Sequence, residues 1–292
     1  MLKLVKSITY LSALIATGVV NTASAGVLPA YKNEYFAYPA VISSKDNGAY
    51  QIIDYNEMRD INGRDAIPEK RVKDNYISLR ARANQQDLVF KTEAGNVKAM
   101  AAGKLKNASF IVIYLHGRGG NRHQGMNDFT FGGNFNRVKY LTSQNGGLYV
   151  TPEFKDFADQ GEAQIAALIS TLKSQSPRAQ LVLSCGSAGG ALCWRIAANE
   201  QAASHLNGLV LLGSLWDDGY LKTASFKRRL PVFLAHGSRD PVFAVSDMEA
   251  FYQKLKKSAS NYPAQFRRFE SGNHGTPIRM ADWYEILNWI LK

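Results

Sequence analysis

Residues 181–194 read Leu-Val-Leu-Ser-Cys-Gly-Ser-Ala-Gly-Gly-Ala-Leu-Cys-Trp, an apolar run that passes through small residues into a second apolar segment. This order predicts a buried strand that turns sharply into a helix. The small side chains are needed there, because only they allow a strand and a helix to approach closely around a tight turn. Ser187 occupies the middle of the turn, where its hydroxyl would project from the end of the strand.

Similar apolar runs recur along the chain and alternate with helical patterns. An amphipathic helix is predicted around residues 165–172. Another is predicted to begin at Ser246, because Ser246 and Glu249 have the spacing of a capping box. Such alternation predicts an α/β fold with a mostly parallel central sheet and helices on both faces. Strands are predicted at 87–92 and 97–102, as a hairpin, and at 110–115, 148–150, 181–183, 209–212, 232–235 and 265–269.

Residues 1–25 have the composition of an export signal. Lys3 and Lys6 precede an uncharged, mostly apolar run, and Ala23 and Ala25 fit a small-x-small cleavage site. The sequence therefore predicts a periplasmic or secreted protein that is cut near Ala25. An uncleaved anchor is the alternative, but the apolar run is short for a membrane span. No other segment is long and apolar enough to suggest one.

Two further segments are expected after this signal. Residues 26–86 are weakly patterned, and we expect them to form an N-terminal extension packed on the main domain. Residues 87–292 are expected to form one α/β domain, since their length suffices for a single large core. The short connection between the strands at 209–212 and 232–235 leaves little room for a large cap domain.

The composition limits the partners that the protein is expected to have. A formal net charge of +11 predicts attraction to anionic surfaces. The basic residues are scattered and no nucleic-acid-binding motif accompanies them, so no nucleic-acid partner is expected. The five histidines lack the spacing of a zinc site, and no metal is expected. Cys185 and Cys193 are the only cysteines, and whether they form a disulfide depends on a distance that the sequence does not supply.

The segment around Ser187 resembles the nucleophile elbow of the α/β-hydrolase superfamily, in which a strained strand-to-helix turn lifts a serine hydroxyl out of the sheet. The superfamily pattern Gly-x-Ser-x-Gly has a glycine at the position of Cys185. Two other interpretations of the turn stay open, a helix cap and a phosphate-binding loop. The lysine that a phosphate-binding loop requires is absent.

A second segment, His116-Gly117-Arg118-Gly119-Gly120, resembles the superfamily's oxyanion-hole motif and directly follows a predicted strand. Backbone N–H groups at such a site stabilise the negative charge that develops during acyl transfer. The resemblance assigns one N–H group to Ala188 and the other to Arg118 or Gly119. His116 is expected to orient this loop and not to act as a base.

Two further segments that resemble superfamily motifs also follow predicted strands. The segment from His236 to Asp240 resembles the acid loop of the superfamily, and Ser271-Gly272-Asn273-His274-Gly275 stands where its general base occurs. The order Ser187, Asp240, His274 is the superfamily's order, so the resemblance implies a catalytic triad of these residues. Asp217 and Asp218 are alternative acids, because some members take the carboxylate from that position. His236 is expected to be structural.

The motifs resemble most closely those of secreted feruloyl esterases and polyhydroxybutyrate depolymerases. This resemblance implies hydrolysis of small-molecule or polymer-linked carboxylic esters through an acyl-enzyme, without a cofactor. A serine peptidase like the prolyl oligopeptidases and a non-catalytic binding protein on the same fold are the alternatives. The aromatic residues predicted to contact substrate, or else to pack in the core, are Phe129, Phe131, Trp216 and Tyr220.

Overall fold

The structure is a computed structural model that describes residues 28–67 and 70–292. The predicted export signal lies outside the described residues. The strands are β1 (Val41–Lys45), β2 (Tyr50–Asp54), β3 (Asp65–Ala66), β4 (Arg71–Val72), β5 (Gln85–Thr92), β6 (Gly95–Gly103), β7 (Phe110–Leu115), β8 (Leu148–Pro152), β9 (Gln180–Gly186), β10 (Leu206–Leu212), β11 (Val232–Gly237) and β12 (Ala264–Glu270). The helices are α1 (Asn33–Phe36), α2 (Asn134–Ser143), α3 (Asp159–Gln175), α4 (Gly190–Ala198), α5 (Glu200–Ser204), α6 (Ala224–Lys227), α7 (Val245–Ser258), α8 (Thr276–Met280) and α9 (Trp283–Ile290).

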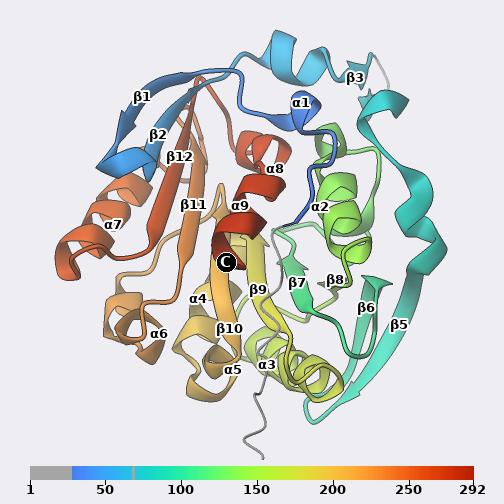
Figure 1. Cartoon of the computed structure of the whole chain (residues 1–292). Coiled ribbons are helices and arrows are strands. Elements are labelled where there is room, and N and C mark those ends of the chain that lie inside the picture. The colour runs from blue at the N-terminus through green and yellow to red at the C-terminus, as the bar shows by residue number, and fades with distance from the viewer. Residues whose placement is uncertain (1–27, 68–69) are drawn as a thin grey trace, which may run out of the picture.

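A ten-stranded sheet in the order β1-β2-β12-β11-β10-β9-β7-β8-β6-β5 forms the centre of the molecule, with β1 and β5 at its two outer edges (Figure 1). The strands from β2 to β8 in this order are parallel neighbours, whereas β1, β6 and β5 pair in the antiparallel sense. All residues of β7, β8 and β11 are buried. Burial on both faces explains why these strands appear in the sequence as continuous apolar runs.

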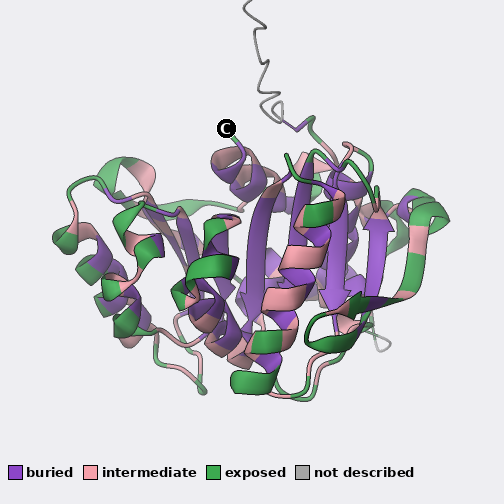
Figure 2. Cartoon of the chain, turned by 90° about the horizontal axis from the view of Figure 1, so that it is seen from below, coloured by how far each residue is buried: buried purple, intermediate pink, exposed green. Residues whose placement is uncertain are grey.

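Helices cover both faces of the sheet, as the sequence predicts (Figure 2). One apolar cluster joins a face of the sheet to α3, α4, α5 and α7. A second cluster joins the opposite face to α2, α8 and α9. The connection between β10 and β11 contains only a short 3-10 turn and α6, so it contributes no cap domain. Among the helices that the structure describes, none is long and apolar enough to cross a membrane.

The segment before β5, expected as an extension, contributes two strands to the main sheet. β2 pairs in parallel with β12, and β1 pairs with β2 through a turn at Asp46, Asn47 and Gly48, all three with positive φ. β1 carries exposed side chains along most of its length, including Val41 and Ile42. It therefore lacks the apolar alternation by which a half-buried strand can be recognised in a sequence.

The start of α7 differs from the prediction. The helix begins at Val245 with Ala244 at its N-cap, and no side chain caps it. Ser246 lies inside the first turn, so the predicted capping box with Glu249 is wrong. The buried residues of α7 are still those that the helical spacing predicts, Met248, Phe251, Tyr252 and Leu255, because side-chain burial decides the face of a helix more strongly than its cap does.

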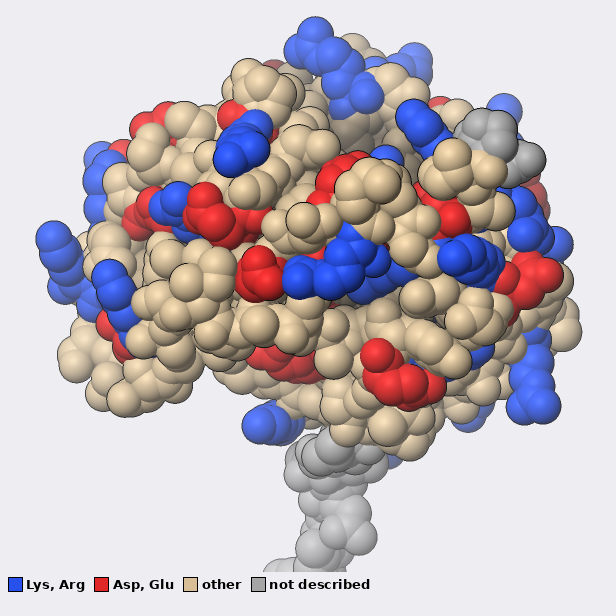
Figure 3. Space-filling view, turned by 90° about the horizontal axis from the view of Figure 1, so that it is seen from above, with Lys and Arg blue, Asp and Glu red and all other residues tan. Residues whose placement is uncertain are grey.

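Charged side chains of both signs share the surface. On the face shown in Figure 3, Lys and Arg side chains lie around the rim and in a group near the centre, with Asp and Glu beside them. Several arginines form ion pairs, such as Arg59 with Asp54 and Arg122 with Asp87. Attraction to anionic surfaces stays a prediction from the net charge.

One buried ion pair fixes the loop after β7 to α2. Lys139 of α2 is fully buried, and its Nζ lies 2.6 Å from Asp128 Oδ1 and 3.0 Å from the Met126 carbonyl oxygen. Asp128 also accepts a hydrogen bond from Arg82 Nε at 2.7 Å. Burial by itself raises the pKa of Asp128, but the hydrogen bonds from Lys139, Asn136 and Arg82 outweigh this effect and hold the pKa below its ordinary value.

We predict that Asp128→Asn lowers the free energy of unfolding at pH 7 by about 3 kcal/mol, because the Lys139 ammonium stays buried without its counter-charge. The folded-state pKa of Asp128 lies below its unfolded value. Its stabilising contribution is therefore complete above about pH 5 and is lost as the pH falls through the folded-state pKa. Urea unfolding of both proteins between pH 3 and pH 7 measures this, and the variant should lack that part of the acid dependence. Identical curves for the two proteins would contradict the prediction.

Candidate active site

Ser187 lies in the tight turn between β9 and α4. The turn is a single 3-10 segment, Ser187–Gly189, that continues directly into the helix. Ser187 has a φ of 52°, in the left-handed region that a residue with a Cβ seldom adopts. Holding that conformation costs about 1–2 kcal/mol. The predicted strand, turn and helix are all present, and the surrounding contacts must offset the strain.

Glycines give the turn the space that it needs. A Cβ at Gly189 would lie 2.7 Å from the carbonyl oxygens of both Leu115 and His116, at the end of β7. A Cβ at Gly117 would lie 2.8 Å from the Cβ of Ser187. The turn and the loop after β7 therefore touch backbone to backbone, which side chains at these positions would prevent.

The imidazole of His274 joins Ser187 to Asp240. Its Nε2 lies 2.8 Å from Ser187 Oγ, and its Nδ1 lies 2.8 Å from Asp240 Oδ2. The His274 side chain is about one quarter exposed, whereas the Asp240 side chain is fully buried. The three residues predicted from the sequence to form a triad are thus linked in series by hydrogen bonds, with His274 in the middle.

The Asp240 carboxylate is surrounded by donors. Oδ1 accepts hydrogen bonds from the backbone N–H groups of Val242 (2.8 Å) and Phe243 (3.1 Å). Burial by itself raises the pKa of Asp240, but the hydrogen bonds from His236, His274 and these two N–H groups outweigh it and hold the pKa well below its usual value. Asp240 is therefore a carboxylate at neutral pH, and it favours a proton on the nitrogen of His274 that faces it.

His236 is a fourth member of this network that the sequence analysis did not foresee. Its side chain is fully buried, and its Nε2 lies 2.8 Å from the Phe243 carbonyl oxygen and 3.2 Å from Asp240 Oδ2. A carbonyl oxygen can only accept, so Nε2 carries a proton and donates to the Phe243 carbonyl oxygen, with Asp240 Oδ2 close to the same N–H group. The spacing of four residues between His236 and Asp240 was visible in the sequence, but no periodicity showed that the two side chains converge.

Backbone contacts bring the loops of Asp240 and His274 together. The N–H groups of Ser238 and Arg239 donate to the carbonyl oxygens of Phe269 and Gly272, at 2.9 and 2.8 Å. Gly213, at the end of β10, has a φ of 55°, and a Cβ there would lie 2.7 Å from the His274 carbonyl oxygen. Residues from three adjacent parallel strands thus meet at the carboxyl edge of the sheet, where open α/β sheets place their ligand sites.

The loop predicted to supply part of an oxyanion hole approaches Ser187 at Gly117. Gly120 donates to the Gly117 carbonyl oxygen at 3.1 Å and closes the turn that contains Arg118 and Gly119. Neither of these two residues donates its N–H to an acceptor among the described residues. Ala188 lies in the first turn of a helical segment, where N–H groups have no intrahelical partner. The arrangement leaves donors for a negatively charged oxygen.

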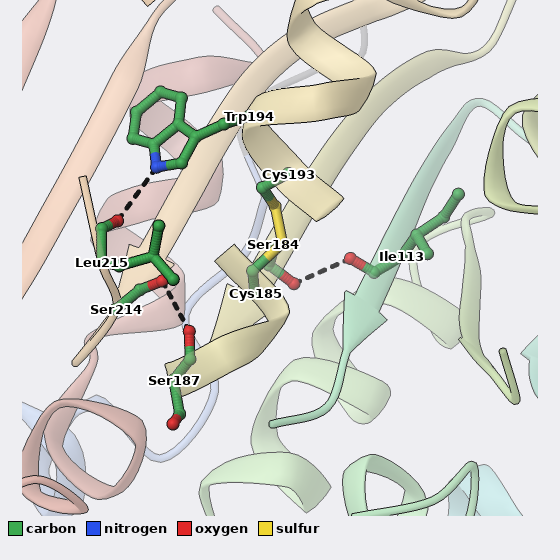
Figure 4. Close-up of a disulfide and its surroundings, with 8 residues drawn as sticks. All are labelled: Ile113, Ser184, Cys185, Ser187, Cys193, Trp194, Ser214 and Leu215. Carbon is green, nitrogen blue, oxygen red and sulfur yellow. Dashed lines mark hydrogen bonds between the residues drawn. A yellow bond between two sulfur atoms is a disulfide. The ribbon is translucent and has the colours of Figure 1, made fainter. Parts of the chain in front are cut away.

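A disulfide joins Cys185, at the end of β9, to Cys193 in α4, and so spans the turn that holds Ser187 (Figure 4). The sequence left this pairing open. In the same view Ser214 Oγ donates to the Ser187 carbonyl oxygen at 2.7 Å, and Trp194 Nε1 donates to the Leu215 carbonyl oxygen at 2.9 Å. Both the turn at Ser187 and the helix α4 that follows it are thus hydrogen-bonded to the segment directly after β10.

The aromatic residues predicted to contact substrate have different surroundings. Phe131 is partly exposed, with its ring 5.1 Å from that of Phe135, and Arg279 of α8 lies over it. Trp216 is partly exposed and follows Ser214 by two residues. The Arg71 guanidinium lies over the ring of Phe129, with its Cζ 3.9 Å from the ring centroid.

Tyr220 is buried in the core. It is 1% exposed, and its hydroxyl lies 2.8 Å from that of Tyr262. Its ring also packs against Trp194, with the centroids 5.0 Å apart. A side chain enclosed in this way offers no surface to a substrate, so the structure does not support Tyr220 as a substrate contact, and of the two interpretations only core packing remains for it.

The alternative acids and the other motif histidine have local roles. Asp217 accepts a hydrogen bond from the Gly219 N–H, and Asp218 forms an ion pair with Lys254 on the surface. His116 is buried, stacks on Phe154 and contacts the Gly117 carbonyl oxygen through Nδ1. Burial lowers its pKa, which suits a neutral residue that holds the loop. Among the described residues no group of three or more His, Cys, Asp or Glu side chains could hold a metal ion.

No protein-family model and no curated protein matches the sequence. Solved structures do match it. A mutant of the feruloyl esterase module from Clostridium thermocellum, complexed with sinapinate, aligns at a TM-score of 0.55 and 14% identity, over 76% of this chain and 93% of that chain. An esterase from Pyrococcus furiosus aligns at a TM-score of 0.51 and 15% identity, over 71% and 91%.

An alpha-beta serine hydrolase homologue from Coxiella burnetii aligns at a TM-score of 0.51 and 15% identity, over 70% of this chain and 95% of that chain. At such low identity these likenesses concern the fold. They confirm the prediction of an α/β-hydrolase fold with a mostly parallel central sheet.

The contact between His236 and Asp240 leads to a prediction about charge. His236→Leu removes one donor from the carboxylate and should raise the pKa of Asp240 toward its ordinary value, because a lost hydrogen bond to the charged form disfavours that form. His236→Gln is the matched control, since its amide can donate from a position close to that of Nε2. Titration of the aspartate carboxyl carbons by ¹³C NMR measures the effect. An unchanged pKa in the leucine variant would show that His236 contributes nothing to the network.

Proposed function

We propose that this chain, which has the α/β-hydrolase fold, is a serine hydrolase that cleaves carboxylic esters through an acyl-enzyme intermediate. The observation that carries the proposal is the pair of 2.8 Å hydrogen bonds from His274 to Ser187 and to Asp240. A serine hydroxyl is a weak nucleophile until a base takes its proton, and the base needs a carboxylate to fix its tautomer. The buried, ionised Asp240 meets the second requirement.

The reaction would proceed in two stages. Ser187 Oγ attacks the ester carbonyl carbon while His274 Nε2 accepts the serine proton, and the proton then passes to the departing alkoxide. The alcohol leaves, and the acyl group stays bound to Ser187 Oγ. A water molecule, activated by His274, attacks the acyl carbon, and His274 returns the proton to Ser187 as the free acid leaves.

Negative charge on the former carbonyl oxygen is stabilised by the backbone in both stages. The N–H group of Ala188 and that of Arg118 or Gly119 are the proposed donors. Removal of one such donor costs about 3–4 kcal/mol of transition-state stabilisation in serine hydrolases. Because these donors are backbone groups in a packed turn, they need little reorganisation when the charge appears.

Phe131 and Trp216 are the proposed contacts for the acyl or alcohol group, because both are partly exposed. Trp216 follows Ser214, which contacts the Ser187 backbone, and Phe131 lies under Arg279 of α8, the helix that begins just after His274. Phe129 is a more distant contact for a long substrate. The structural neighbour from Clostridium thermocellum is a feruloyl esterase module complexed with sinapinate. This likeness makes hydroxycinnamate esters a first class of substrate to test beside simple alkanoyl esters.

We further propose that the protein acts outside the cytoplasm. The predicted export signal supports this location, and so does the disulfide between Cys185 and Cys193, since disulfides persist in oxidising compartments and are rare in the cytosol.

The serine assignment is tested with a fluorophosphonate probe and 4-nitrophenyl esters. Wild-type protein should be labelled and should hydrolyse the esters, whereas Ser187→Ala should lose labelling and at least about 10⁴-fold in kcat. Ser174→Ala is the matched control, because the Ser174 hydroxyl is on the surface of α3 and donates within that helix, to the Thr171 carbonyl oxygen. Turnover of aminoacyl amides in preference to esters would favour a peptidase, and an unlabelled, inert wild type would favour a binding protein.

The close contact between the oxyanion loop and the serine gives a second test. Gly117→Ala places a Cβ about 2.8 Å from the Cβ of Ser187, which must push the loop away from the turn. We expect kcat for 4-nitrophenyl acetate to fall about 10- to 100-fold, because the N–H groups of Arg118 and Gly119 move out of line. Wild-type kcat in a folded Gly117→Ala protein would argue against an oxyanion role for this loop.

A further inference from the structure

The disulfide encloses the reactive serine in a small covalent ring. Cys185 is the last but one residue of β9 and is hydrogen-bonded into the sheet between β7 and β10. Cys193 lies on α4, eight residues further along the chain, with a Cα–Cα separation of 6.4 Å from Cys185. Ser187 and Ala188 both lie between the two cysteines. The bond therefore links the strand arm and the helix arm of the turn that presents the nucleophile (Figure 4).

The backbone inside this ring loses an unusually large amount of conformational entropy when it is ordered. It contains Gly186, Gly189 and Gly190, and glycine loses more conformational entropy on ordering than any other residue. Ser187 must still hold a left-handed φ of 52°, a conformation that persists only where its surroundings over-determine it. A flexible segment with a strained residue at its centre needs constraints at both ends.

Side-chain hydrogen bonds fasten each arm of the turn to a different neighbouring segment. Ser184 Oγ donates to the Ile113 carbonyl oxygen and fastens the strand arm to β7. Trp194 Nε1 donates to the Leu215 carbonyl oxygen and fastens the helix arm beyond β10. Ser214 Oγ fastens the turn itself to the segment after β10, through the Ser187 carbonyl oxygen. The disulfide is the covalent bond that joins the two arms directly across the turn.

We propose that the Cys185–Cys193 disulfide is a positioning device for the nucleophile, which holds Ser187 Oγ and the Ala188 N–H in the relative orientation that attack on an ester requires. The proposal rests on the function proposed above. In the superfamily pattern a glycine at position 185 lets the strand and helix approach without a side chain. Here a side chain is present, and a covalent bond fixes the two elements in its place.

The bond is protected in the folded protein. Cys185 and Cys193 are both 0% exposed within the cluster that also contains Leu183, Leu192 and Trp194. Thiol–disulfide exchange requires access of a thiolate to a sulfur, so exchange must wait for a local opening of β9 and α4. The disulfide is thus a constant part of the site, consistent with a positioning role.

The double variant C185A/C193A removes the bond and leaves Ser187, the three glycines and the substrate-facing surface unchanged. We expect kcat for 4-nitrophenyl acetate to fall about 10- to 100-fold, since a displacement of about 1 Å at a reacting group has an effect of this size. KM should change by less than about twofold. The rate constant for fluorophosphonate labelling should fall by the same factor as kcat, and circular dichroism should show a folded protein at the assay temperature.

Leu172→Ala is the matched control for general destabilisation. Leu172 is 0% exposed in the same apolar cluster, and it lies near the end of α3. The ion pair between Glu162 and Arg195 joins α3 to α4 at the other end of α3, near its start. This variant should lower the unfolding temperature and leave kcat unchanged. A merely structural disulfide would give the same result as Leu172→Ala.

If C185A/C193A does not fold, reduced wild-type protein replaces it. A phosphine in urea below the unfolding midpoint converts the disulfide to two thiols, which alkylation and mass spectrometry count, and urea alone is the control. A folded, disulfide-free protein with wild-type kcat and labelling rate would overturn the proposal and leave the hydrolase function standing. A wild-type protein that is neither labelled nor active on esters would remove the proposed function, and the positioning role with it.

Discussion

The close approach of β9, α4 and the loop after β7 around Ser187 is the constraint on which the candidate site depends. It requires glycine at positions 117 and 189, where a Cβ would collide with neighbouring backbone or with Ser187 itself. It also forces Ser187 into a left-handed conformation that costs about 1–2 kcal/mol. The strain is useful, because the same turn lifts the hydroxyl clear of the sheet and leaves the Ala188 N–H free beside it. The turn that exposes the Ser187 hydroxyl is therefore also the strained part of the candidate site.

The parallel sheet determines where Asp240 and His274 lie relative to Ser187. Adjacent strands end at the same edge, so the loops that carry Asp240 and His274 meet there although the residues lie far apart in the chain. Four donors keep Asp240 ionised in a fully buried position. His236 supplies one of them, so the network extends one residue deeper into the core than a three-residue triad. A buried carboxylate with this many partners fixes the direction of His274 toward Ser187.

Much of this arrangement was predictable from the sequence, for definite physical reasons. Central strands such as β7 are apolar on both faces and stand out as continuous runs, and the small residues around Ser187 identify the turn. β1 carried no such signal because its side chains are largely exposed. Ser246 was misjudged as a cap, because α7 begins one residue earlier, at Val245, and no side chain caps it. The contact of His236 with Asp240, the burial of Tyr220 and the disulfide depend on distances that appear only when the chain is folded.

The central claim is that an acyl group is carried on Ser187 during turnover. Rapid quenching of the protein with an activated ester, followed by proteolysis and mass spectrometry, tests it most directly. The account predicts a burst of alcohol release equal to the amount of protein, and the acyl mass on the peptide that contains Ser187. Ester turnover without a burst and without an adduct on that peptide, or with an adduct on another residue, would contradict it.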